Sequence, residues 1–148
     1  MTAYKLALRF VGEIQEQPGA VDHPFIVWSH SLCGLGMDTP DLVPWCSSFT
    51  NAIAWMLRLP RSKSAAARSW LSVGIPIGSL FEAQVGYDVV ILNRNGPTDP
   101  SVAGPGHVGF YAGRELDHVL ILGGNQSNGV SIARFPVSRV LGIRRLKA

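Results

Sequence analysis

Apolar residues in the first half of the chain recur every three or four positions, which is the spacing of one face of an α-helix. The first run covers about 3–16; Thr2 precedes it as a candidate cap, and the sequence QPG ends it. A proline in the first turn and a glycine at the end predict a second helix over 22–34. Two further helices are predicted, one with Cys46 in its first turn and a short one over 62–74.

Beyond these helices the pattern changes to short runs rich in β-branched residues, separated by turn residues. They predict strands over 88–93, 107–113, 118–124, 130–135 and 140–145. Only RELD separates the second strand from the third, so these two are expected to form a hairpin in an antiparallel sheet. Helices followed by strands predict an α+β domain with the helices on one face of the sheet. The connection over 93–106 has no periodic pattern and is either mobile or functional.

Length and composition fit one globular domain, 1–148. Hydrophobic residues make up 47% and charged residues 16%, which excludes the polar, highly charged composition of disordered chains. The N-terminus lacks the pattern of a secretory signal, and no apolar run is long enough to span a bilayer. We therefore expect a soluble chain, made in the host cytoplasm and without stable membrane insertion.

The chain is weakly basic, with a net charge of +3 and a tail, RVLGIRRLKA, that gathers several cations. Such an excess favours anionic partners, bacterial cell wall and nucleic acid included, without choosing between them. The alternative is an ordinary solvated face.

The two cysteines, Cys33 and Cys46, form no CxxC pair and show no zinc spacing. Cys46 follows a proline-broken loop and lies in the first turn of a predicted helix, where unpaired N–H groups favour a thiolate. It is therefore a candidate nucleophile, although a lone cysteine is more often a small core residue. Cys33 lies on the apolar side of its helix, and we interpret it as structural.

A thiolate nucleophile needs an imidazole, and a polar group that orients the imidazole. His107 opens an apolar strand and is well placed to be the base. Asn125 and Gln126 follow the next strand, and either amide oxygen could accept the Nδ1–H of His107. Trp45, next to Cys46, is expected to line the substrate groove.

The other histidines carry weaker signals. His23 and His30 are seven residues apart in or near one helix, but no HExxH or carboxylate pattern supports a metal site. They are interpreted as surface or helix-capping groups, and His118 as a structural residue at the hairpin. The sequence GGNQSNG leads into a strand and not a helix, so a phosphate loop is weakly supported.

Four segments, taken together and in this order, resemble the CHAP/NlpC-type superfamily of papain-like cysteine peptidases and amidases, in particular small endolysin-like phage and prophage proteins. The segments are VPWCSSFTNAIAWML, AARSWLSVG, GHVGFYAG and LILGGNQSNGVSIARFPVSRVLGIRR. The resemblance covers nearly the whole chain. It implies a papain-like α+β fold with the nucleophile at a helix start packed on an antiparallel sheet. It also implies hydrolysis of amide bonds in the peptide part of bacterial peptidoglycan.

Carried over by motif, Cys46 matches the nucleophile, His107 the base and Asn125 the third, polar member. Relatives often have an acidic residue two positions before the asparagine, where this chain has Gly123, so the orienting role falls on Asn125 or Gln126. A PGD sequence frequent in relatives is also replaced, by GYD at residues 86–88. We assign Trp45 and Gln126 to substrate binding.

The expected partner is peptidoglycan, reached at the cell wall or periplasm after release or export. We expect no cofactor, no metal ion, no nucleic-acid partner and a monomer. Two other functions stay open, a non-catalytic wall- or virion-associated binding module and a thioester-forming acyltransferase. These residues do not distinguish a phage endolysin from an injected effector, nor an amidase from an endopeptidase.

Overall fold

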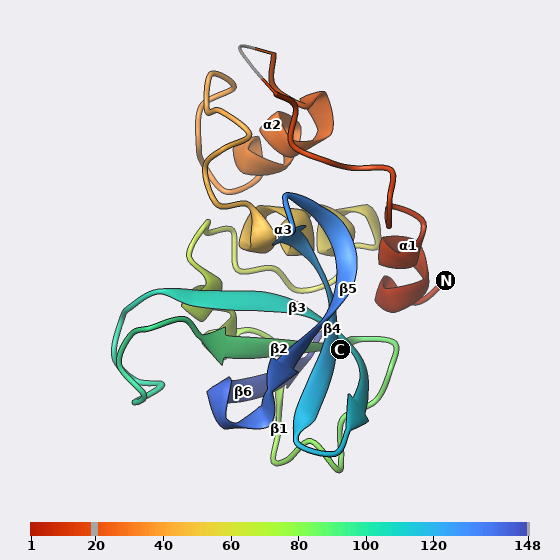
Figure 1. The fold of residues 1–148 in the computed structure, drawn as a ribbon, viewed down its shortest axis with the longest axis vertical. Coiled ribbons are helices and arrows are strands. Elements are labelled where there is room, and N and C mark those ends of the chain that lie inside the picture. The colour runs from red at the N-terminus through yellow and green to blue at the C-terminus, as the bar shows by residue number, and fades with distance from the viewer. Residues whose placement is uncertain (19–20, 148) are drawn as a thin grey trace.

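The structure is a computed structural model that describes residues 1–18 and 21–147 of the chain. It is an α+β fold in which three helices and two 3₁₀ turns accompany a six-stranded antiparallel sheet (Figure 1). The strands are β1 (Ile75–Ile77), β2 (Asp88–Asn93), β3 (Gly106–Glu115), β4 (His118–Gln126), β5 (Gly129–Pro136) and β6 (Val140–Arg145). Their order across the sheet is β1-β6-β2-β3-β4-β5.

The five strands predicted from the sequence are confirmed, and the short edge strand β1 is an addition to them. The predicted hairpin is also present: Glu115 pairs with His118, and Leu116 in the turn between them has a left-handed φ of 50°. β-branched runs bounded by turn residues therefore located the sheet correctly.

The helices are shorter than predicted. α1 (Ala3–Leu8) begins at Thr2, whose side chain accepts a hydrogen bond from the Lys5 amide as expected of a cap. It does not continue to residue 16, because Gly12 turns the chain at φ 78° and the next residues run beside β5, where Gln15 pairs with Gly129. Hydrogen-bonded turns therefore follow α1 as far as Glu13, and contact with β5 replaces only the end of the predicted helix.

The second predicted helix is α2 (Pro24–Ser31), and its cap is the side chain of His23. The third is α3 (Cys46–Met56), which begins at Cys46. The fourth is reduced to the 3₁₀ helix η1 (Ala67–Ser72). A second 3₁₀ turn, η2 (Val137–Arg139), joins β5 to β6.

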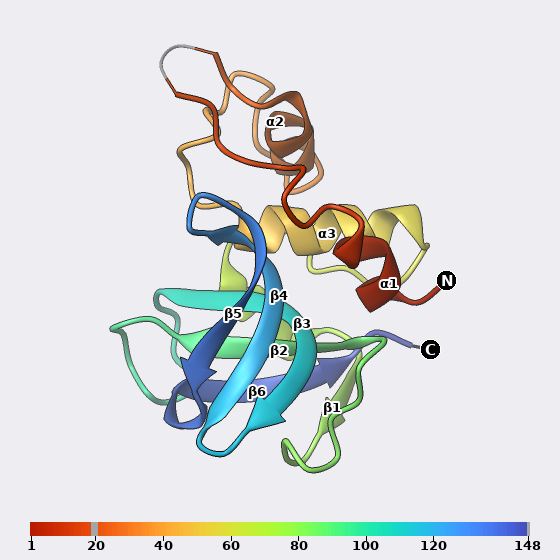
Figure 2. The ribbon, with the colours of Figure 1, turned by 45° about the vertical axis from the view of Figure 1, so that its right-hand side comes forward.

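The main core lies between α3 and the sheet (Figure 2). α3 packs on β3 and β4, and α2 lies beyond α3, away from the sheet (Figures 1 and 2). A smaller apolar cluster covers the other face of the strands. Successive strand residues alternate between the two faces, so Val108 packs on the α3 side whereas His107 pairs with Leu92 on the other.

Candidate active site

Cys46 is the first residue of α3, and its side chain is buried. The preceding Trp45 offers no side-chain cap, so the N–H groups of the first turn lack partners within the helix. Burial raises the pKa of the Cys46 thiol, and the backbone N–H groups of Val108 and Ser47 oppose that rise. The free protein therefore holds a neutral thiol, in contrast to the thiolate that the helix-end argument favours.

The start of α3 is held by side chains that also anchor the segment before η1. Ser47 Oγ donates to the Ser64 carbonyl at 2.6 Å and accepts from Trp70 Nε1 at 2.9 Å. Asn51, one turn later, accepts from the Lys63 amide at 2.9 Å. These bonds position the 65–67 segment as one wall of a cavity of about 180 Å³ that Cys46 lines.

Trp45 does not line this cavity. Its side chain is 0% exposed, and its Nε1 donates to Glu16 Oε1 at 2.8 Å. Its ring packs edge-on against Phe49 and lies close to Gly124. The prediction that Trp45 lines the substrate groove is wrong, because the indole is a fully buried core group that packs the helix start against the end of β4.

His107 is buried on β3, and its Nε2 lies 2.8 Å from Gln126 Oε1. The direction of this bond follows from the rest of the Gln126 amide, because Gln126 Nε2 donates to the carbonyls of Ser131 and Ile121 at 2.8 and 3.2 Å. The amide oxygen must then accept, so the neutral imidazole carries its proton on Nε2 and has a lone pair on Nδ1. Nδ1 is the basic atom, whereas the sequence suggested Nδ1–H as the donor to an amide.

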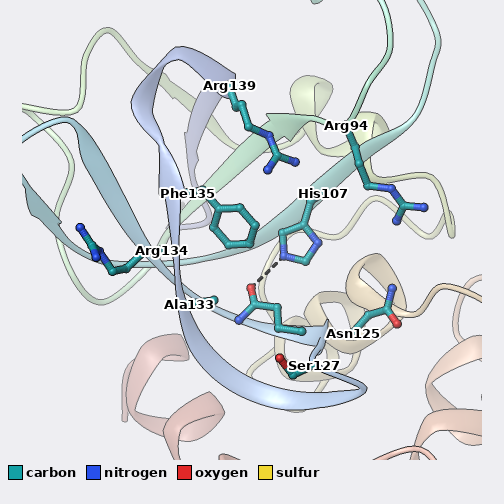
Figure 3. Close-up of a pocket in the computed structure, with 9 residues that line it drawn as sticks. Arg94, His107, Asn125, Ser127, Ala133, Arg134, Phe135 and Arg139 are labelled. Carbon is teal, nitrogen blue, oxygen red and sulfur yellow. Dashed lines mark hydrogen bonds between the residues drawn. The ribbon is translucent and has the colours of Figure 1, made fainter.

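Gln126, assigned above to substrate binding, makes the contact with His107 that the family pattern gave to Asn125. The pairing of β4 with β5 shifts between Gly123 and Gln126, and Asn125 within this bulge adopts a left-handed φ of 58°. Asn125 lines the same pocket as His107, beside it and not bonded to it (Figure 3). A Cβ on residue 123 would lie 2.8 Å from Gln126 Oε1, so Gly123 provides the room that Gln126 occupies.

Cys46 and His107 line two different cavities, and Arg94 lines both of them. Gly106, the neighbour of His107, lines the cavity of Cys46, and the Val108 amide faces the thiol. No hydrogen bond joins Cys46 to His107 among the residues that the structure describes. The backbone on both sides of His107 therefore borders the Cys46 site, whereas the imidazole lies on the other face of β3, without the direct contact that an ion pair requires.

Two arginines that sequence reasoning missed flank His107 (Figure 3). Burial lowers the pKa of His107; the Gln126 hydrogen bond opposes this, and the charges of Arg139 and Arg94 lower it further. The imidazole therefore stays neutral, which suits a base. In the sequence Arg94 is an isolated cation that carries no signal of a site, whereas Arg139 begins the basic tail, whose charge excess was the only signal for it.

The other cysteine and histidines lie elsewhere. Cys33 is buried, and burial raises the pKa of its thiol. His30 is buried and its Nδ1 lies 2.8 Å from Ser48 Oγ, while His118 is bonded to Asp117 beside the hairpin turn. Residues 1–18 and 21–147 hold no cluster of three or more His, Cys, Asp or Glu side chains that could bind a metal ion.

Models of known protein families gave no match to the chain, and a search of curated proteins found no relative. Within the described residues, no helix combines the length and the apolar character needed to cross a membrane.

Proposed function

We propose that the chain is a cysteine hydrolase that cleaves amide bonds in the peptide part of bacterial peptidoglycan. The observation that carries the proposal is a cysteine at a helix start, in a cavity that shares Arg94 with the pocket of His107. The basic nitrogen of this histidine is set by Gln126. The resemblance to the CHAP/NlpC-type superfamily supports the papain-like form of the fold and the choice of substrate. The cell wall is then the place of action, reached after release or export.

In the first step, the Cys46 sulfur attacks the amide carbonyl while Nδ1 of His107 takes the thiol proton. Because burial keeps both groups neutral, the proton moves during the attack and not before it. Substrate binding has to bring the two atoms into contact, as is common for catalytic hydrogen bonds that are loose in the free protein. The unpaired N–H groups of the first turn of α3 are candidate donors to the oxyanion.

In the second half, the imidazolium protonates the amine as the C–N bond breaks, which leaves a thioester on Cys46. His107 then deprotonates a water molecule that attacks the thioester carbonyl. As the C–S bond breaks, the imidazolium returns this proton to the sulfur, which regenerates the thiol and the neutral imidazole and releases the carboxylic acid. Gln126 holds the imidazole ring throughout, through its bond to Nε2.

The test is to incubate purified sacculi with wild type, Cys46→Ala, His107→Ala and Cys33→Ala, and to identify released fragments by mass spectrometry. Cys33→Ala is the matched control, because Cys33 is also a buried cysteine but lies outside the site. Wild type and the control are expected to release the same fragments, and the other two variants none. Fragment masses distinguish amidase from endopeptidase cleavage.

The same experiment separates the alternative functions. Products that carry an added amine in place of a free acid would assign an acyltransferase. Binding of sacculi without release from several wall chemotypes, unchanged by Cys46→Ala, would assign a binding module and contradict the hydrolase.

A further inference from the structure

A pocket of about 320 Å³ lies beside His107, and its charged wall is made of arginines (Figure 3). Arg94, Arg134 and Arg139 line it, together with the amides of Asn125 and Gln126. Within the described part of the chain, no Asp or Glu lines this pocket. A concave site with convergent cations and no internal counter-charge is suited to an anion.

The three arginines are not equivalent. Arg134 has a counter-ion, Glu115 at 3.4 Å, and its side chain is largely exposed. Arg139 is fixed, because its Nε donates to the Asn93 carbonyl at 2.8 Å and its guanidinium lies 5.3 Å from the Phe135 ring centre. In Figure 3 that guanidinium points toward His107. Arg139 therefore presents a positioned fork of N–H donors to the pocket.

Arg94 links this pocket to the nucleophile. It lines both the arginine pocket and the cavity of Cys46. Its charge acts on both reacting groups, since it lowers the pKa of Cys46 and that of His107, in each case less than burial changes them. An anion between Arg94 and Arg139 would thus lie next to the bond that Cys46 attacks.

We propose that Arg94 and Arg139 form a carboxylate subsite, so that the substrate is an acidic peptide with a free carboxylate beside the cleaved amide. The choice of a peptide rests on the proposed function, whereas anion binding by the two arginines does not. A guanidinium binds a carboxylate through two parallel hydrogen bonds, which gives orientation as well as affinity.

The test uses Cys46→Ala, which cannot turn substrate over, and two peptides that differ in one group: L-Ala-γ-D-Glu-L-Lys, and the same peptide with the glutamate α-carboxylate as amide. NMR titration of the imidazole signals gives both the affinity and the pKa of His107. The acid is expected to bind about ten- to a hundredfold more tightly than the amide. Bound acid should also raise the pKa of His107, since it screens the two arginines.

Arg94→Gln and Arg139→Gln are each expected to reduce the preference for the acid, and the double variant to abolish it. Arg114→Gln is the matched control, because Arg114 lies over the Phe81 ring, outside the pocket. Arg139→Lys keeps the charge without the fork and should retain part of the preference. Thermal unfolding of each variant checks that the fold is intact.

Equal binding of acid and amide, no binding of either, or a preference that survives in the double variant would overturn the subsite. The proposed function fails separately: a preference for the acid without any release from sacculi by wild type would leave the subsite standing and refute the hydrolase. Hydrolysis of the acid and amide peptides at equal rates would refute the subsite and leave the hydrolase standing.

Discussion

His107 donates from Nε2 to Gln126 Oε1 over 2.8 Å, and the amide nitrogen of Gln126 is committed to two backbone carbonyls. This relationship fixes the tautomer of a buried histidine through a neutral partner. A carboxylate in the same place would also stabilise the imidazolium, whereas the amide orients the ring and leaves its charge to depend on the surroundings. Gln126 therefore determines which nitrogen is basic.

Replacing Gln126 by Leu, which has a similar volume, removes the acceptor and lets the proton move to Nδ1. We expect kcat/KM to fall about ten- to a hundredfold, the equivalent of one hydrogen bond worth about 1.5–3 kcal/mol. The ¹⁵N shifts of the imidazole report the tautomer independently of any substrate. Asn125→Ala is the control and should leave the tautomer unchanged, because Asn125 does not contact the ring nitrogen. Loss of the Nε2–H form in Asn125→Ala but not in Gln126→Leu would assign the orienting role to Asn125.

The pH dependence of activity should reflect two buried neutral groups. Burial, assisted by Arg139 and Arg94, lowers the pKa of His107 from 6.5, so the acid limb of kcat/KM is expected below pH 6.5. Burial raises the pKa of Cys46, so alkylation by iodoacetamide should keep accelerating above pH 9. Measuring alkylation in a Cys33→Ala background removes the second thiol. An alkylation rate that is already maximal at pH 7 would indicate a resting thiolate–imidazolium pair and contradict the neutral one.

Stability should fall as the solution becomes acidic. Burial lowers the pKa of His107 and of His30, so below pH 6.5 the unfolded chain binds protons that the native protein does not. The stabilising contribution is complete above pH 6.5 and is lost as pH falls, by at most about 1.4 kcal/mol per pH unit for each group.

Urea unfolding at pH 7 and pH 5 measures this loss of unfolding free energy, and His107→Gln should show a smaller loss than wild type. His118→Gln is the control, because His118 lies at the surface beside Asp117. Equal pH dependence in all three proteins would refute the assignment to His107.

Much of the fold was visible in the sequence where local pattern and tertiary structure agree. β2 and β6 have the predicted bounds, 88–93 and 140–145, because β-branched runs there are bounded by turn residues. The start of α3 at Cys46 follows from the apolar spacing after a proline-broken loop. The prediction that the first helix continues over residues 9–16 is wrong, although their apolar spacing is helical. The Ile14 carbonyl accepts a hydrogen bond from the Val130 amide, which ties this segment to β5.

The candidate site was predicted less completely than the fold. The bulge at Gly124 and Asn125 places Gln126 against His107. The alternation of side chains along a predicted strand does not show where such a bulge lies. Arg94 and Arg139 are far apart in sequence and come together only because η2 returns beside the end of β2. Trp45 was misassigned because adjacency to a nucleophile does not show which way a side chain points.

The connection over 93–106, which the sequence left as mobile or functional, is organised by Arg68. This guanidinium is buried and donates to the Asn93 side chain and to the carbonyls of Pro97, Asp99, Val102 and Pro105. The same segment supplies Gly104, Pro105 and Gly106 to the cavity of Cys46. Arg68 is thus a positioning residue that holds one wall of the site.

Arg68→Met keeps the apolar stem and removes the five donors. We expect the free energy of unfolding to fall by about 2–4 kcal/mol, since several buried carbonyls lose a charged donor. Hydrogen exchange over 94–105 should accelerate, and KM should rise more than kcat falls. Arg9→Met, a surface change in the turn after α1, is the matched control. Unchanged exchange in Arg68→Met would mean that the segment is ordered by other contacts.

Gly124, near the end of β4, packs closely against the helix that carries the nucleophile. A Cβ at this position would lie 2.6 Å from Cζ3 of Trp45 and 2.9 Å from Cβ of Phe49, so Gly124→Ala has to push the end of β4 away from the start of α3. Overpacking of this kind costs about 1–3 kcal/mol of unfolding free energy, measurable by urea unfolding. Gly142→Ala is the matched control: its Cβ would meet only the end of the Leu71 side chain at 2.7 Å, which can rotate away, so less than about 1 kcal/mol is expected. Because Gln126 follows two residues after Gly124, the end of β4 that moves also carries the side chain that orients His107. Gly124→Ala should therefore lower kcat/KM as well as stability, whereas equal losses in the two alanine variants would show that the close approach to Trp45 is not what aligns the site.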